Sequence, residues 1–193
     1  MARPRQFDRD EALQKATDVF WTHGYEATSM TDLQKALGIG RQSLYSTFGD
    51  KPRIFDEVVQ RYVSEARAMI AERVGPDAGI AELRAHLLGA AGGLAGPEER
   101  RGCLIMNSCV ERAPHDPGIA ELLRGGLDAM RGAFGQALTN AKQRGEIRAD
   151  IDVEAAASSL LAQNAGMAVL ARTGATAEDL ASAVNVAIDA LLL

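Results

Sequence analysis

Apolar residues recur at spacings of three and four through most of the chain, and glycines, prolines and capping residues interrupt this pattern at intervals. The pattern predicts helices over about 8–23, 30–37, 41–47, 51–74, 80–94, 103–111, 118–144, 153–172 and 177–192. N-cap residues precede several of them, namely Asp8, Ser29, Asp50, Asp152 and Thr176. No segment keeps the strict alternation of a strand, so we expect an all-α fold of about nine helices.

Two short predicted helices near the N-terminus are joined by Gly38-Ile39-Gly40. The second of them is anchored by Leu44 and Phe48, whereas most of its other side chains are polar. Such a helix needs a polar partner, and a groove of DNA offers one. The two glycines allow the sharp turn of a helix-turn-helix motif. We therefore predict a three-helix DNA-binding domain over residues 1–50 and a larger helical domain over 51–193.

Length and composition are compatible with this interpretation. The 193 residues are 47% hydrophobic, which is enough to bury a core, and aromatic residues are scarce, as in helical proteins rich in alanine and leucine. The sequence has no apolar run of twenty residues and its N-terminus is polar, so we expect neither a membrane span nor a signal peptide and place the protein in the cytoplasm. Two cysteines are too few for a disulfide framework.

The net charge of −5 is unevenly distributed. Residues 1–62 are neutral overall, with nine basic and nine acidic residues, so the acidity belongs to the larger C-terminal part. Arg3 and Arg5 form a short basic arm, while Arg41, Lys51 and Arg53 surround the short polar helix. This distribution suits contact with phosphates, although two arginines at a terminus are equally typical of a solvated tail.

A set of residues at fixed spacing resembles the N-terminal DNA-binding domain of TetR/AcrR-type transcriptional regulators over about residues 8 to 60. The matching positions are Phe20, Gly24, Tyr25, Thr28, Ser29, Thr31, Leu37, Gly38, Ile39, Ser43, Leu44, Tyr45, Phe48, Asp50, Lys51 and Phe55. The resemblance implies a C-terminal all-α domain that dimerises and usually holds a ligand cavity. Residues 101–104 and 113–117 are similar to one subgroup of these regulators.

The predicted recognition helix begins with Arg41 and Gln42, which can pair with guanine and adenine respectively. Hydroxyl groups nearby suit phosphate contact, and Lys51 resembles the phosphate-binding lysine of the family. The alternative role of Ser29, Ser43 and Asp50 is to cap helices. The predicted DNA-binding set is Arg3, Arg5, Ser29, Thr31, Arg41, Gln42, Ser43, Tyr45, Ser46, Thr47 and Lys51. We expect Tyr25 to support the motif from its core.

A ligand site is predicted among apolar or flexible residues of the C-terminal part, each of which also suits ordinary core packing. These residues are Met69, Leu87, Met106, Cys109, Met130, Phe134 and Met167. The last two predicted helices combine small residues with a wide apolar face. One side can pack on the chain's own core while the other pairs with a second copy, which predicts a homodimer through these two helices.

The leading hypothesis is thus a dimeric, ligand-responsive repressor that binds a palindromic operator, with an activator left open. An alternative is a regulator that responds to oxidants through Cys103 and Cys109, or to a metal bound by a cysteine with His86 or His115. The simpler interpretation is that both thiols are buried and inert. Six residues on one helix place the two cysteines about 240° apart, which disfavours a disulfide between them. The sequence has no nucleophile with a paired base and no metal-ligand spacing, so a helical carrier or enzyme is the remote alternative and we expect no cofactor.

Overall fold

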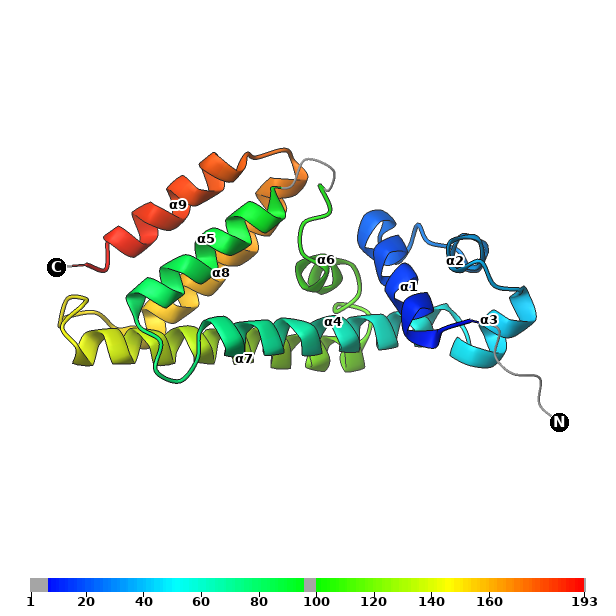
Figure 1. Cartoon of the computed structure of the whole chain (residues 1–193), viewed down its shortest axis with the longest axis horizontal. Helices are drawn as coiled ribbons and strands as arrows, with labels where there is room; N and C mark the ends of the chain where they lie inside the picture. Colours follow the sequence, from blue (N-terminus) through cyan, green and yellow to red (C-terminus); the bar gives the residue numbers. More distant parts are fainter. Residues whose placement is uncertain (1–6, 96–99, 193) are drawn as a thin grey trace.

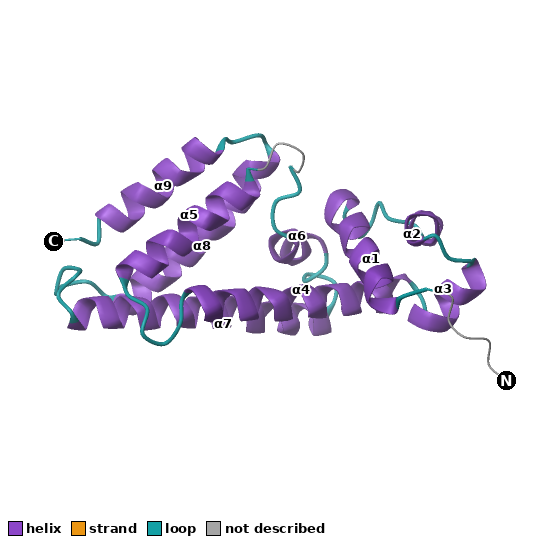
Figure 2. Ribbon diagram, viewed as in Figure 1, coloured by secondary structure: helices purple, strands orange, loops and turns teal. Residues whose placement is uncertain are grey.

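The computed structural model describes residues 7–95 and 100–192, and within these ranges the chain consists of nine α-helices without a strand (Figures 1 and 2). The helices are α1 (Arg9–His23), α2 (Met30–Leu37), α3 (Arg41–Phe48), α4 (Lys51–Arg73), α5 (Ile80–Leu94), α6 (Leu104–Glu111), α7 (Pro117–Gln143), α8 (Val153–Arg172) and α9 (Ala177–Asp189). The predicted all-α class is confirmed. The main difference is that α9 ends at Asp189, where the chain turns so that the Leu191 carbonyl accepts a hydrogen bond from the Arg148 amide.

The predicted N-caps form as expected. The side chains of Asp8, Ser29, Asp50, Asp152 and Thr176 each accept a hydrogen bond from a backbone amide in the first turn of the helix that follows. Ser29 and Thr176 complete capping boxes with aspartates three residues later. Local hydrogen bonding therefore sets where these helices begin.

Helices α1 to α3 gather at one end of the molecule, and α5, α8 and α9 lie toward the other end (Figure 1). Helix α4 connects the two. Its first half buries Ile54, Phe55 and Val63 in the core cluster shared with α1 to α3, and its second half buries Ile70 in a separate C-terminal cluster. One continuous helix therefore belongs to both cores.

The C-terminal core is built from pairs of helices. Helix α5 packs extensively along α9, and α7 packs along α8, whereas α8 and α9 contact each other only slightly. The outer faces of α8 and α9 expose Val169, Leu170 and Val186. None of the helices in residues 7–95 and 100–192 is both long and apolar enough to cross a membrane.

Candidate nucleic-acid interface

Helix α3 has one buried and one exposed face. Leu44 and Phe48 are buried in the N-terminal core and hold the helix in place. Arg41, Gln42, Ser43 and Ser46 are exposed, Thr47 is half-buried, and Tyr45 keeps 41% of its surface accessible. The structure therefore brings the six predicted polar residues of this helix onto an accessible surface.

Two of these side chains are already arranged against each other. The Arg41 guanidinium lies over the Tyr45 ring, 5.6 Å from its centroid, as expected for residues one turn apart on a helix. The Ser46 hydroxyl, by contrast, donates to the Ser43 carbonyl at 3.1 Å.

At the start of α2, Ser29 acts as a helix cap. Its Oγ accepts from the Asp32 amide at 3.2 Å and donates to Asp32 Oδ2 at 2.6 Å. The Ser29 amide also donates to Asp32 Oδ2, at 3.0 Å, and the bonds from the Ser29 hydroxyl and amide lower the pKa of the Asp32 carboxyl. Thr31 is exposed on the first turn of the same helix. The capping role of Ser29 is thus observed, and phosphate contact by Ser29 and Thr31 stays a prediction.

Lys51 is half-buried and already has partners within the chain. Its Nζ donates to the Tyr25 carbonyl at 3.0 Å and lies 4.2 Å from the centroid of the Tyr25 ring. Tyr25 itself is buried between Phe20 and Phe55, with ring centroids 6.2 and 4.8 Å away, which confirms its predicted supporting role. Arg3 and Arg5 of the predicted basic arm lie outside the described residues.

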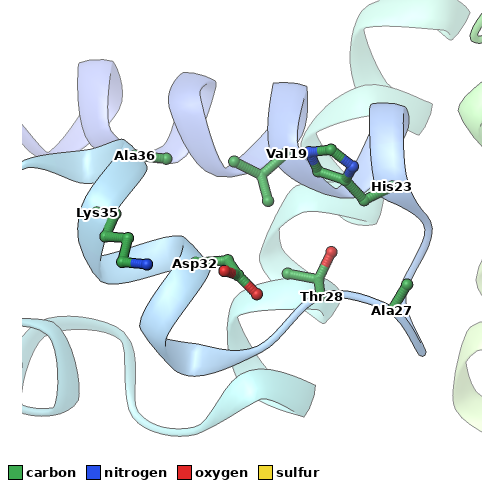
Figure 3. Close-up of a pocket in the computed structure, with 7 residues that line it drawn as sticks. All are labelled: Val19, His23, Ala27, Thr28, Asp32, Lys35 and Ala36. Carbon is green, nitrogen blue, oxygen red and sulfur yellow. The ribbon is translucent and has the colours of Figure 1, made fainter.

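An open hollow lies on the same domain, between α1 and α2 (Figure 3). Its volume is about 620 Å³. Its lining includes one acidic and one basic residue and is made of Val19, His23, Ala27, Thr28, Asp32, Lys35 and Ala36. None of the predicted DNA-binding residues lines this hollow, so it is distinct from the exposed face of α3.

The seven residues predicted to form a ligand site are divided between the two cores. Leu87, Phe134 and Met167 are buried in the C-terminal cluster, and Met130 packs at its edge. Met106 and Cys109 instead pack against the N-terminal cluster. Met69 is 46% exposed on α4. The structure therefore brings four of the seven together.

The C-terminal core contains polar groups that the sequence pattern does not predict there. His86 is buried, its ring lies 5.9 Å from that of Phe134, and its Nδ1 has no hydrogen-bond partner. Burial lowers the pKa of His86 to about 4, so the imidazole is neutral at pH 7. Met130 lies one helical turn before Phe134 on α7, and its sulfur accepts from the side-chain amide of Asn164. The Oδ1 atom of Asn164 is also buried without a hydrogen-bond partner. The one signal in the sequence is a histidine within the apolar stripe of Leu83 and Leu87.

The cysteine alternative gains no support from the geometry. Cys103 and Cys109 are free and half-buried, and burial raises the pKa of the Cys109 thiol, which opposes the reactive thiolate form. Across the part of the chain that the structure describes, no three metal-ligating side chains come together.

Comparison with known proteins agrees with this architecture. Residues 12–58 match the family model described as bacterial regulatory proteins, tetR family, and residues 79–187 match the tetracyclin repressor-like C-terminal domain. The chain belongs to the TetR family. It is a DNA-binding transcriptional regulator in which α2 and α3 form the helix-turn-helix.

Individual TetR-family relatives match over nearly the whole chain. The uncharacterized HTH-type transcriptional regulator YezE of Bacillus subtilis is 34% identical over 99% of this chain and 100% of its own. The HTH-type transcriptional repressor ComR of Escherichia coli is 34% identical over 92% of this chain and 86% of its own. These relatives are transcriptional regulators.

A solved TetR-family structure extends the likeness to three dimensions. A cysteine mutant of the regulator CifR, in complex with a 26-base-pair operator DNA, is 30% identical to this chain. It superposes with a TM-score of 0.84 and covers 97% of this chain and 99% of its own. The domain arrangement seen here is therefore shared with a related TetR-family regulator.

Proposed function

We propose that this protein is a homodimeric repressor that places α3 of each subunit in the major groove of a palindromic operator, and that a small-molecule effector bound in the C-terminal domain releases it. The observation that carries the proposal is the exposed polar face of α3 on a helix held in place by Leu44 and Phe48. A rigid helix with accessible hydrogen-bonding side chains is what direct readout of base edges requires.

Within this proposal, Arg41 and Gln42 read bases because they stand at the N-terminal end of α3. Ser43 and Ser46 lie on the same exposed face. Phosphate contacts come from hydroxyls on either side of the groove and from Lys51, and they set the orientation of the domain. The proposed phosphate-contacting residues are Arg3, Arg5, Ser29, Thr31, Tyr45, Thr47 and Lys51.

A second copy is needed because one short helix reads too few bases for useful specificity. We assign the subunit contact to α8 and α9, since their outer faces expose Val169, Leu170 and Val186 in the single chain. Exposed apolar side chains favour association with another apolar surface. Two subunits then present two α3 helices to two half-sites.

Release by an effector follows from the position of α4 in both cores. We place the effector near the C-terminal residues Leu87, Met130, Phe134 and Met167, where two buried polar atoms lack partners. To release DNA, the effector must bind the non-binding arrangement more tightly than the binding one, because equal affinity for both would shift nothing. The DNA-binding domain of residues 1–50 and the effector domain of 51–193 are then coupled through α4.

The related proteins support repression rather than activation, because ComR is a transcriptional repressor and CifR has been solved with operator DNA. A regulator of this kind acts where the chromosome lies, so we place it in the cytoplasm. A binding site that overlaps a promoter would agree with repression, whereas a site well upstream of one would indicate activation.

Selection of bound sites from random DNA, followed by affinity measurements at two salt concentrations, tests the proposal. We expect a palindromic site whose binding weakens as salt increases. Replacing Arg41 by Ala should weaken binding by about tenfold to a hundredfold for each half-site, because a bidentate contact to guanine is worth about 1–3 kcal/mol.

The matched control is Arg131→Ala, which removes the same charge from an exposed position on α7. Its affinity for the selected site should stay at the wild-type value. Wild-type affinity in the Arg41→Ala variant, or failure of the wild-type protein to select any site, would contradict the proposal.

A further inference from the structure

The turn between α1 and α2 is held by a side chain from the C-terminal part of the chain. Glu111, the last residue of α6, directs both carboxylate oxygens at consecutive backbone amides of this turn. Its Oε2 accepts from the Tyr25 amide at 2.9 Å, and its Oε1 accepts from the Glu26 amide at 2.8 Å. One carboxylate thus chelates two amides that are 85 or more residues away in sequence.

This pair of hydrogen bonds requires a carboxylate at position 111 and a glycine at position 24. Gly24 has a φ of +84°, and a Cβ at this position would lie 3.1 Å from both Glu111 oxygens. Glycine therefore provides both the backbone conformation and the room for the chelate. A carboxylate accepts at both oxygens, whereas the amide of a glutamine accepts at only one. Replacing Glu111 by Gln consequently leaves one of the two amides facing an NH₂ group.

Tyr25 is held on its other sides by neighbouring residues. Its carbonyl accepts from Lys51 at the start of α4, and the Arg112 guanidinium lies 4.2 Å from the centroid of its ring. Arg112 is in turn paired with Asp116 at 3.0 Å. The amide, carbonyl and ring of Tyr25 are thus fixed by the end of α6 and the start of α4, five residues before α2 begins at Met30.

The opposite end of α6 also contacts α1. The Trp21 indole Nε1 donates to the Gly102 carbonyl at 3.1 Å, just before α6 begins. The Arg101 guanidinium lies 4.4 Å from the centroid of the Trp21 ring. The two ends of α6 thus contact the last turn of α1 and the residues that follow it.

We propose that Glu111 is a positioning residue for operator recognition. Its chelate of the Tyr25 and Glu26 amides holds α2 and α3 at one angle to α4, so that the two α3 helices of the dimer keep a single separation. This inference rests on the proposed binding of a dimer to a two-part operator. Without the chelate, the domain samples a wider range of angles and tolerates half-sites at other spacings.

The test compares Glu111→Gln with Glu26→Gln, which removes the same charge from the exposed neighbouring side chain. For each protein, affinity is measured for the selected operator and for the same operator with one base pair inserted between its half-sites. The ratio of these affinities should fall by about tenfold in Glu111→Gln, the equivalent of one lost charge-assisted hydrogen bond, and keep its wild-type value in Glu26→Gln. A merely destabilised fold lowers the active fraction equally on both DNAs and leaves the ratio unchanged.

Hydrogen exchange without DNA provides a second readout. The Tyr25 and Glu26 amides should exchange at least about tenfold faster in Glu111→Gln, with α4 and α7 amides unchanged. If that variant does not fold, Glu111→Asp keeps the charge but shortens the side chain, and the same reduced ratio is expected. A wild-type affinity ratio in a folded variant would overturn the inference, whether or not the two amides exchange faster. A wild-type protein that selects no operator would instead count against the proposed function, and amide exchange would still decide whether the chelate forms.

Discussion

The two glycines that precede α3 differ in backbone conformation and in role. Gly38 has a φ of +67° in the left-handed region and ends α2, and a Cβ at this position would meet nothing within 4 Å. Gly40 has a φ of −66° and is the N-cap of α3, a conformation that other residues adopt freely. The predicted turn therefore uses Gly38, and Gly40 contributes a helix start rather than the turn.

His86 should make the free energy of unfolding of the protein depend on pH. Its pKa is about 4 in the folded protein and near 6.5 when unfolded, so between these values the unfolded chain binds more protons. The contribution of the neutral imidazole to the free energy of unfolding should therefore be fully present above about pH 6.5. It should decrease as the pH falls toward 4, by up to about 3 kcal/mol. Urea unfolding at pH 7 and pH 5 measures this loss.

The contribution of His86 is isolated by comparing variants. His86→Leu should lose less stability than the wild type between pH 7 and pH 5, whereas a His115→Gln variant, changed at an exposed site, should behave as the wild type does. Equal pH dependence in the wild type and His86→Leu would show that the buried imidazole is not the cause.

Among the helices, α7 is unusual for its glycines, which cost helix stability unless they serve packing. A Cβ on Gly126 would lie 3.1 Å from Val63 Cγ1, so this glycine lets α7 approach α4 closely. A Cβ on Gly132 would meet nothing within 4 Å. Gly132→Ala should therefore stabilise the protein by about 0.5–1 kcal/mol, measured as a higher urea midpoint.

Gly126→Ala is the matched comparison on the same helix. It gains the same helix propensity but must displace Val63, so its urea midpoint should lie below that of Gly132→Ala. Equal midpoints for the two variants would show that the approach of α4 and α7 does not depend on Gly126.

For the whole molecule, self-association should depend on α9. Val186 is 69% exposed in the single chain, and the proposed subunit interface would bury it. Val186→Asp places a charge in that interface from both subunits, which should weaken association by about a hundredfold or more and reduce operator binding with it. Sedimentation velocity over a range of concentrations measures the change.

Val110→Asp is the control, because Val110 is 78% exposed but lies on α6, which is not one of the two helices assigned to the interface. This variant should sediment as the wild type does. A dimer that survives Val186→Asp and dissociates with Val110→Asp would place the subunit contact elsewhere on the molecule.

Local sequence was enough to predict the all-α class, the helix bounds to within a few residues, the N-caps and the helix-turn-helix. These features depend on signals within one helical turn, such as apolar periodicity, a capping side chain or a glycine at a helix end. The exposed face of α3 could be predicted for the same reason, since burial of Leu44 and Phe48 leaves the intervening side chains outside.

Which distant residues meet became visible only in three dimensions. The fold packs Met106 against one core and Met130 at the edge of the other, buries His86 without a partner for Nδ1, and gives Lys51 a partner in Tyr25. It also brings Glu111 to the turn before α2. Contacts of this kind join residues far apart in sequence, and no local pattern records them, because they depend on how the helices pack rather than on how each one forms.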